Sequence, residues 1–216
     1  MTKQARGEAT GDFETDVVSL EIIRGKLLAV ADEMGLVLMR SSMSPVIYEV
    51  LDFACGFCDP DGDLVSQTNG ITVFTGTFST QINVIKRKFG DRIRPGDIFM
   101  LNNPYEGGTH YNDVGVIKPV FVDDELFAFA ISISHWTDIG GKSPGSLPAD
   151  ATEIFQEGIC FPGIHIYKAG ERQDAVFEIV ANNVRIPKMA LGDLNAALAS
   201  VRIAEKRCLE LCAKYS

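Results

Sequence analysis

The sequence is poor in positive charge and has no long hydrophobic run. Its 20 Lys and Arg residues stand against 29 Asp and Glu residues, for a formal net charge of −9, and no basic run is longer than residues 86–88. Surfaces that bind nucleic acid or anionic membranes need Lys and Arg to neutralise phosphates, so the composition argues against both partners. The polar N-terminus lacks the apolar segment of a secretory signal, and the longest apolar stretch, around residues 126–133, is too short to span a bilayer.

Cysteine and histidine are also scarce. Five Cys, an odd number, and 3 His fit a reducing cytoplasm better than a disulfide framework, so we expect a cytoplasmic protein. Cys55 and Cys58 have the spacing of a metal-binding pair, but no second pair of that spacing follows, and their surroundings predict a half-buried strand. Cys208 and Cys212 lie one turn apart in an apolar helical segment. We interpret both pairs as packed thiols.

The hydrophobic content is sufficient for one core. The chain has 216 residues, 46% of them hydrophobic. Residues 1–14 predict a disordered tail, followed by one domain over residues 15–216. The spacing of apolar residues predicts a long helix at residues 17–39 and a last helix from Asp193 to about Lys214. The other predicted elements are helices at residues 82–89 and 175–183, and strands at residues 53–58, 64–67, 72–76, 98–101, 114–122, 126–134 and 159–167.

These elements predict an α+β fold. We expect a mixed or antiparallel sheet with a central hairpin, packed by the long N-terminal helix and the C-terminal helix. The hairpin consists of the two apolar strands on either side of a polar turn at residues 123–125. If it closes within this turn, paired residue numbers sum to about 248, which sets Asp113 opposite His135 and Phe121 opposite Phe127.

Two polar motifs meet at the open end of this hairpin. Directly opposed Cβ atoms lie roughly 5 Å apart, so the Asp113 carboxylate and the His135 imidazole come together there. His110, three residues before Asp113, can turn toward the same point. Two histidines and one carboxylate suit manganese, iron or zinc and leave coordination positions open, so these three are the predicted metal ligands. A hydrogen-bonded histidine pair that closes the hairpin mouth is the alternative, and the residue pattern leaves both open.

Neighbours of this point are candidates for catalysis or substrate binding. Asp138 is a candidate fourth ligand, hydrogen-bond partner of His135 or general base, and equally a loop carboxylate in water. Gly107 and Gly108 allow the backbone to approach a ligand closely.

The loop with Gly140, Gly141, Lys142 and Ser143 offers backbone amides, a hydroxyl and one ammonium group to an anionic substrate. An ordinary flexible connection is the alternative. Gly-Lys-Ser also occurs in nucleotide-binding P-loops, but the first glycine of such a loop would fall at Trp136. We therefore predict no ATP site on this chain.

Two further predictions concern residues outside these motifs. His165 alternates with apolar residues, and we expect it to face solvent or a partner. Arg185 and Asp193 are expected to form an ion pair where the last helix begins.

Both histidine motifs, and further blocks along the chain, follow the pattern of a known family. The motifs are residues 107–113 (Gly-Gly-Thr-His-Tyr-Asn-Asp) and 135–141 (His-Trp-Thr-Asp-Ile-Gly-Gly). With them the sequence resembles the hydantoinase B / 5-oxoprolinase family, which includes the hydantoinase B subunit and the α subunits of acetone-carboxylase-type enzymes. The blocks that extend the resemblance over almost the whole chain are residues 20–24, 31–35, 52–53, 144–146, 157–158, 183–187, 192–194 and 207–211.

The resemblance implies a metal site and a nucleotide-dependent reaction. In the acetone-carboxylase relatives the His-x-x-Asp motif and the later histidine hold a divalent metal, usually manganese, which implies His110, Asp113 and His135 here, with zinc or iron as alternatives. A hydantoinase A-like partner binds ATP and phosphorylates a carbonyl-type substrate such as a cyclic amide, and the metal-bearing part completes ring opening or a carboxylation. His135 and Asp138 are then the expected catalytic residues, with Asp138 orienting or deprotonating the nucleophile. The expected substrate contacts are Gly107, Gly108, Gly140, Gly141 and Ser143.

The chain departs from the family pattern in three respects. It has Asn103 where the family usually has Asp, and Phe74 where a histidine is frequent. Full-length members are also much longer. We therefore consider two hypotheses, a metal-binding subunit or fragment of an ATP-dependent cyclic-amide hydrolase or ketone carboxylase, and a non-catalytic assembly subunit or truncated copy of the same family.

Overall fold

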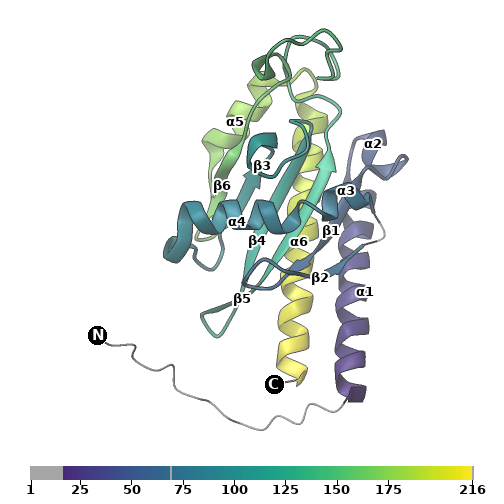
Figure 1. Ribbon diagram of the computed structural model, residues 1–216, viewed down its shortest axis with the longest axis vertical. Helices are drawn as coiled ribbons and strands as arrows, with labels where there is room; N and C mark the ends of the chain where they lie inside the picture. Colours follow the sequence, from purple (N-terminus) through teal and green to yellow (C-terminus); the bar gives the residue numbers. More distant parts are fainter. Residues whose placement is uncertain (1–16, 69, 216) are drawn as a thin grey trace.

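The computed structural model describes residues 17–68 and 70–215, so the tail predicted at residues 1–14 lies outside the described residues. Within them the strands are β1 (Phe53–Cys58), β2 (Leu64–Gln67), β3 (Ile98–Leu101), β4 (Asp113–Val122), β5 (Glu125–His135), β6 (Pro162–Lys168) and β7 (Glu171–Arg172). They form one antiparallel sheet in the order β2-β1-β5-β4-β3-β6-β7 (Figure 1). The predicted α+β class with a central hairpin is confirmed.

Helices cover both faces of this sheet. They are α1 (Val17–Ser41), α2 (Pro45–Tyr48), α3 (Thr72–Thr75), α4 (Phe78–Phe89), α5 (Asp174–Asn183) and α6 (Pro187–Tyr215), with short 3₁₀ turns η1 (Gly90–Arg92), η2 (Pro104–Glu106) and η3 (Ile154–Gln156). The two long helices, α1 and α6, run side by side on one face, and α3 and α4 lie on the other (Figure 1). The predicted packing by an N-terminal and a C-terminal helix is therefore confirmed.

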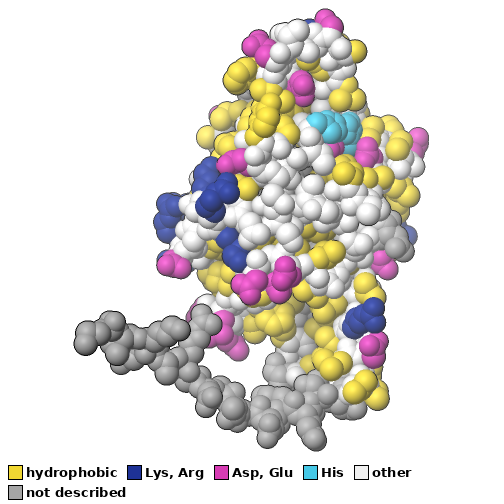
Figure 2. All heavy atoms as spheres, in the orientation of Figure 1, with side chains coloured by type: hydrophobic (Ala, Val, Ile, Leu, Met, Phe, Trp, Pro, Cys, Tyr) yellow, Lys and Arg dark blue, Asp and Glu magenta, His cyan; other side chains and the backbone are white. Residues whose placement is uncertain are grey.

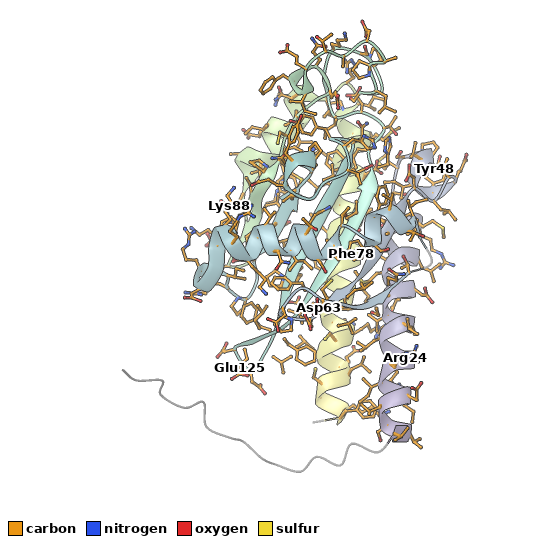
Figure 3. The ribbon with its side chains drawn as sticks, in the orientation of Figure 1. Arg24, Tyr48, Asp63, Phe78, Lys88 and Glu125 are labelled. Atoms are coloured by element: carbon orange, nitrogen blue, oxygen red, sulfur yellow. The ribbon has the colours of Figure 1, made fainter. Side chains whose placement is uncertain are left out.

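Two apolar cores join these layers. The core under α1, α5 and α6 includes Phe57 and Leu194, and the core under α3 and α4 includes Phe78 and Phe129. Figure 3 marks Phe78 at the start of α4. Because helices cover both faces, the inner strands are apolar along their whole length rather than alternating. β1 is buried at every residue, which corrects the prediction of a half-buried strand.

The cysteines belong to these cores. Cys55, Cys58 and Cys208 are buried free thiols. Burial raises the pKa of the Cys55 thiol to about 11 and that of Cys58 to about 12, so both stay protonated near neutral pH. Their interpretation as packed thiols is confirmed.

The central hairpin has the predicted register at its open end. β4 and β5 pair without irregularity from Asp113 opposite His135 to Val120 opposite Ala128. β1 pairs with the outer side of β5, and β3 with the outer side of β4. The mouth of the hairpin is therefore held by four neighbouring strands.

The predicted register is wrong at the closed end of the hairpin. Asp123 and Asp124 both have positive φ, 48° and 65°, which is the conformation of a tight two-residue hairpin turn. This turn is one residue shorter than predicted, so Phe121 lies opposite Leu126 and a bulge leaves Phe127 unpaired. Phe127 consequently lines an apolar groove instead of the opposite core.

Residues 72–75 form a helical turn, α3, where a strand was predicted. Their β-branched side chains favour a strand, but tertiary packing overrides this weak preference. Phe74 is buried in the core between α4 and the sheet, and its amide donates to the carbonyl of Ile71 at 3.0 Å.

The last helix starts at Pro187, ahead of the predicted start at Asp193. Proline is favoured in the first helical turn because its missing N–H would have no partner there. Asp193 is instead a fully buried residue within α6. Its Oδ1 accepts from the backbone amides of Met43 at 2.7 Å and Ser44 at 3.1 Å, immediately before α2.

An apolar groove of about 490 Å³ lies between α1, α6 and the closed end of the hairpin. Its lining includes Leu27, Phe127 and Leu211. This groove is at the opposite end of β4 and β5 from the paired Asp113 and His135. Among the described helices, none combines the length and apolar character that a bilayer-spanning segment needs.

Asp193 generates a prediction about stability. We expect Asp193→Ala to lower the free energy of unfolding by about 2–3 kcal/mol, because two buried backbone amides lose their acceptor. Asp193→Asn keeps one acceptor oxygen and should lose less. Urea denaturation of the three proteins measures this, and equal stability of Asp193→Ala and wild type would contradict the proposed contact.

Candidate metal centre

The three predicted ligands converge at the open end of the hairpin. Asp113 begins β4, His135 ends β5, and the two residues are paired. His110 returns to them through a turn in which the Asp113 amide donates to the His110 carbonyl at 3.0 Å. One ligand atom from each of the three residues lies within 4.8 Å of the others. Histidine side chains form a patch on the molecular face shown in Figure 2.

The Asp113 carboxylate is the centre of this group. Its Oδ1 lies 3.0 Å from His135 Nδ1, and its Oδ2 lies 3.1 Å from His110 Nε2. The Thr109 hydroxyl donates to the same Oδ2. The Asp113 side chain is 1% exposed, whereas that of His110 is 34% exposed. The carboxylate is therefore shielded by the protein, and the group is accessible from the His110 side.

The electrostatics of the group favour a cation. Burial opposes the charge of Asp113, but hydrogen bonds from His110, His135 and Thr109 outweigh it and lower the pKa of Asp113 to about 2. The hydrogen bond to Asp113 raises the pKa of His110, although burial opposes this shift. The group thus contains a buried negative charge that stabilises a positive charge beside it.

Asp52 is a nearby carboxylate that sequence reasoning did not assign to the site. Its Oδ2 lies 3.9 Å from His135 Nδ1, and its carbonyl accepts from the His135 amide at 3.0 Å. Burial raises the pKa of Asp52, and the charge of Asp113 contributes in the same direction. The available signal was the family block at residues 52–53, but the pairing of β1 with β5 that brings Asp52 here is a long-range contact.

The residues present fit a divalent metal. Two imidazoles and one carboxylate aim their ligand atoms at a common region, and this combination is one that manganese, iron and zinc accept. The alternative of a histidine pair bonded to Asp113 uses the same contacts, because a proton on His110 and a metal ion both satisfy the buried carboxylate. His110, Asp113 and His135 are the residues that would hold the ion, with Asp52 next to them.

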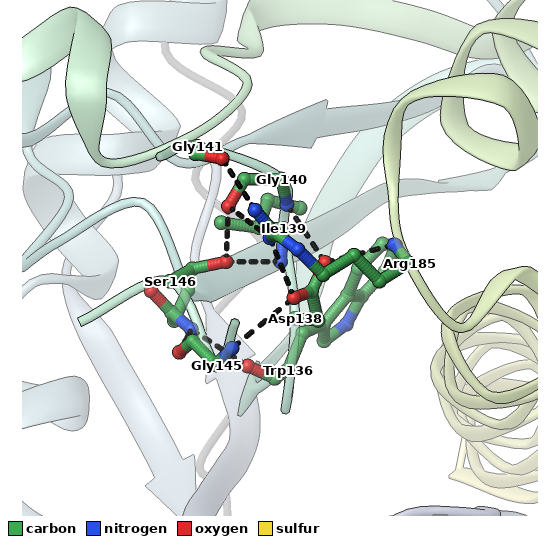
Figure 4. Close-up of polar contacts among 9 residues, drawn as sticks. Trp136, Asp138, Ile139, Gly140, Gly141, Gly145, Ser146 and Arg185 are labelled. Atoms are coloured by element: carbon green, nitrogen blue, oxygen red, sulfur yellow. Dashed lines mark hydrogen bonds and ion pairs between the residues drawn. The ribbon is translucent and has the colours of Figure 1, made fainter. Parts of the chain in front are cut away.

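Asp138 does not belong to this group. Its Oδ1 accepts from the backbone amides of Gly140 and Arg185, each at 3.0 Å (Figure 4). Its Oδ2 accepts from Arg185 Nη1 at 3.0 Å and from the Gly145 amide at 3.2 Å. Burial opposes ionisation, but these hydrogen bonds lower the pKa of Asp138. The predicted ion pair of Arg185 with Asp193 is therefore wrong, because Arg185 pairs with Asp138.

The loop after β5 is closed by internal contacts. Arg185 donates to the Gly140 carbonyl at 3.1 Å and to the Gly141 carbonyl at 2.7 Å. Lys142 Nζ contacts the carbonyl and the carboxylate of Asp150, each at 3.0 Å. The ammonium group expected to serve an anionic substrate is thus used within the loop. The Ser143 carbonyl accepts from the backbone amide three residues later, and substrate binding by Gly140, Gly141 and Ser143 stays a prediction.

Gly107 and Gly108 determine the path of the chain toward His110. Gly107 has a φ of 93°, and a Cβ atom there would lie 2.8 Å from Cγ2 of Thr80 in α4. A Cβ atom on Gly108 would lie 2.8 Å from the carbonyl oxygen of Asn102. Glycine is needed at both positions because the chain passes so close to these neighbours. Their contact with substrate stays a prediction.

A cavity of about 320 Å³ opens beside His110. Residues 146–149 form part of its lining, and Glu157 contributes the carboxylate. Sequence reasoning missed this cavity because its wall is a loop without periodicity, which reaches His110 only through tertiary contacts. The glycines predicted to contact substrate are absent from its lining.

His165 is not exposed to solvent or a partner as predicted. Its ring packs between Phe89 and Phe99, with centroid distances of 4.6 Å to each. Its Nε2 lies 3.4 Å from Asp97 Oδ2. The side chain is 18% exposed and belongs to the core.

Solved structures with the same fold define the class of protein. The crystal structure of the ATP-dependent caprolactamase from Pseudomonas jessenii matches with a TM-score of 0.89 and 30% identity, over 94% of this chain and 35% of that one. The nucleotide-free structure of acetone carboxylase shares the fold, with a TM-score of 0.87 and 19% identity, over 93% of this chain and 27% of that one.

Residues 16–216 match the family model described as Hydantoinase B/oxoprolinase, and the chain belongs to this family. It is 36% identical over 205 residues to the B subunit of a putative D-/L-hydantoinase from Pseudomonas sp. (strain NS671), a match that covers 93% of this chain and 35% of the relative. The chain thus spans about a third of the length of the relatives it matches. The resemblance deduced from the motifs is confirmed.

The lowered pKa of Asp113 predicts how acid destabilises the metal-free protein. The folded pKa of about 2 lies below the ordinary value of about 3.9, so the charged carboxylate stabilises the fold above that value and ceases to do so as the pH falls through about 2. The full contribution is about 2 kcal/mol, and roughly half is lost by about pH 3. Asp113→Asn should therefore lose less free energy of unfolding than wild type between about pH 5 and 3. Identical pH dependence in urea denaturation would contradict this assignment.

Proposed function

We propose that this chain is the metal-binding subunit, or part of it, of an ATP-dependent enzyme that hydrolyses cyclic amides or carboxylates ketones. The observation that supports the proposal best is the convergence of His110, Asp113 and His135 at the hairpin mouth. Family membership adds that the relatives bear the names of a hydantoinase subunit and a caprolactamase. A cyclic amide is therefore the first substrate class to test.

The three ligands would hold one divalent ion, with manganese as the first candidate and zinc or iron as alternatives. When bound, such an ion polarises a carbonyl or phosphoryl oxygen or acidifies a water molecule. The hydrogen bond from Thr109 orients the Asp113 carboxylate toward both imidazoles. Asp52 would complete the ligand set or accept a proton, because its carboxylate is close to His135 and its pKa is raised.

ATP would be bound by a hydantoinase A-like partner rather than by this chain. The Gly-Lys-Ser sequence lacks the first glycine of a P-loop, and its Lys142 is paired with Asp150. Several relatives carry names that identify them as subunits, among them the beta subunit of caprolactamase. The activated substrate would enter the cavity beside His110.

A non-catalytic assembly subunit, or a truncated copy of the family, is the second candidate. Asn103 in place of the family's usual Asp and the coverage of about a third of the relatives favour it. Such a protein would keep the fold and the partner contact without turnover.

Metal analysis tests the first candidate. After dialysis, wild-type protein should retain about one equivalent of a divalent metal, because three protein ligands form the site. His135→Ala should bind it at least about 100-fold more weakly, since even the loss of an outer partner costs 10–100-fold. Elemental analysis and calorimetric titration give the two values.

His165→Ala is the matched control, because it removes the one histidine outside the group. Its metal content should equal that of wild type, with thermal melts to verify that both variants fold. Equal metal content in wild type and His135→Ala would refute the metal site.

Assembly distinguishes the two candidates from an isolated protein. We expect the chain to co-elute with a hydantoinase A-like ATP-binding subunit in size-exclusion chromatography. ATP-dependent turnover of a cyclic amide by the complex would favour the enzyme, and assembly without turnover would favour the non-catalytic subunit. A stable monomer that does not bind this subunit would count against both.

A further inference from the structure

A single ion pair joins the loop after β5 to the junction between α5 and α6. Asp138 and Arg185 are 47 residues apart in sequence. The Asp138 side chain is 4% exposed and that of Arg185 is 37% exposed. The guanidinium contacts three oxygen atoms, on Asp138, Gly140 and Gly141, at distances from 2.7 to 3.1 Å (Figure 4). A planar guanidinium can make these contacts together, whereas a lysine ammonium cannot match their geometry.

These contacts extend to Ser146. The Ser146 hydroxyl donates to the Gly140 carbonyl at 2.6 Å and accepts from the Ile139 amide at 2.8 Å. The neighbouring Gly145 amide donates to Asp138. Ser146 has a φ of 54°, a left-handed conformation that is uncommon for a residue with a side chain. Such a conformation persists only where surrounding contacts impose it, and here the pair and its hydrogen bonds do so.

The loop is also bonded to the segment that carries the metal ligands. Asn112 lies between His110 and Asp113, and its Nδ2 donates to the Trp136 carbonyl at 2.8 Å and to the Gly145 carbonyl at 3.3 Å. The loop is thus held at one end by the ligand strand and at the other by Arg185. Residues 146–149, which follow directly, line the cavity beside His110.

We propose that Asp138 and Arg185 are positioning residues that hold residues 145–149 as a wall of the cavity beside His110. This inference rests on the proposed function, in which the cavity receives the cyclic substrate. All four hydrogen bonds to the Asp138 carboxylate come from the loop and Arg185, so its role is to shape the cavity and not to take up a proton. Substrate binding then depends on the pair, and metal binding does not.

Arg185→Lys is the test variant. Lysine keeps the charge but loses the planar set of donors, so the loop should open locally. We expect hydrogen exchange of the amides at residues 139–149 to accelerate about tenfold or more, while α1 and α6 keep their protection. Quenching of Trp136 fluorescence by iodide should increase, because this is the one tryptophan in the chain and it lies in the loop. The affinity for manganese should stay within about twofold of wild type.

Arg207→Lys is the matched control. It makes the same change in an ion pair with Glu33 on the α1–α6 seam, away from the cavity. It should leave exchange in the loop and Trp136 quenching unchanged. Asp138→Asn keeps an acceptor for the backbone amides and should open the loop less than Arg185→Lys.

Kinetics of the assembled enzyme provide the functional measurement. With the ATP-binding subunit present, Arg185→Lys should raise KM for caprolactam or hydantoin about tenfold and change kcat much less, as expected for lost positioning. Unchanged loop exchange, or a loss of manganese affinity equal to the loss in kcat/KM, would overturn the inference. Absence of metal from wild-type protein would refute the proposed function alone, since loop exchange still decides whether the pair holds the wall.

Discussion

The site depends on one buried carboxylate. Asp113 is almost completely shielded from water, yet it carries a charge that three hydrogen bonds stabilise. An isolated charge in such a position would be very unfavourable, so the two histidines must stay in contact with it or share a cation with it. The same constraint explains why the imidazoles are held at 3.0 and 3.1 Å from its two oxygens. The preference of the site for a cation follows from the burial of this one side chain.

The sheet supplies the rigidity that this constraint requires. β4 and β5 are the central strands, with neighbours on both sides and helices over both faces. A residue at the end of such a strand has little freedom to move away from its partner. The irregularity of the hairpin, the bulge at Phe127, lies at the far end, where it does not disturb the pairing of Asp113 with His135.

Segments distant in sequence complete the surroundings of the site. Asp52 arrives through the pairing of β1 with β5, and Arg185 arrives from the α5–α6 junction. Asp193 binds the amides before α2 and so joins the last helix to the first part of the chain. Several blocks that carried the family resemblance are therefore contact partners of one another. Together they orient the loop and the cavity beside His110.

The sequence alone determined the α+β class, the hairpin and the meeting of His110, Asp113 and His135, because strand alternation and hairpin pairing are local rules. It misjudged the turn at residues 123–125, the helical turn at residues 72–75 and the start of α6, where packing overrides local preference. The tertiary structure decided that Arg185 pairs with Asp138, that Asp52 joins the site and that residues 146–149 face His110. These contacts join segments whose proximity depends on strand order and helix packing, which periodicity in a single sequence does not encode.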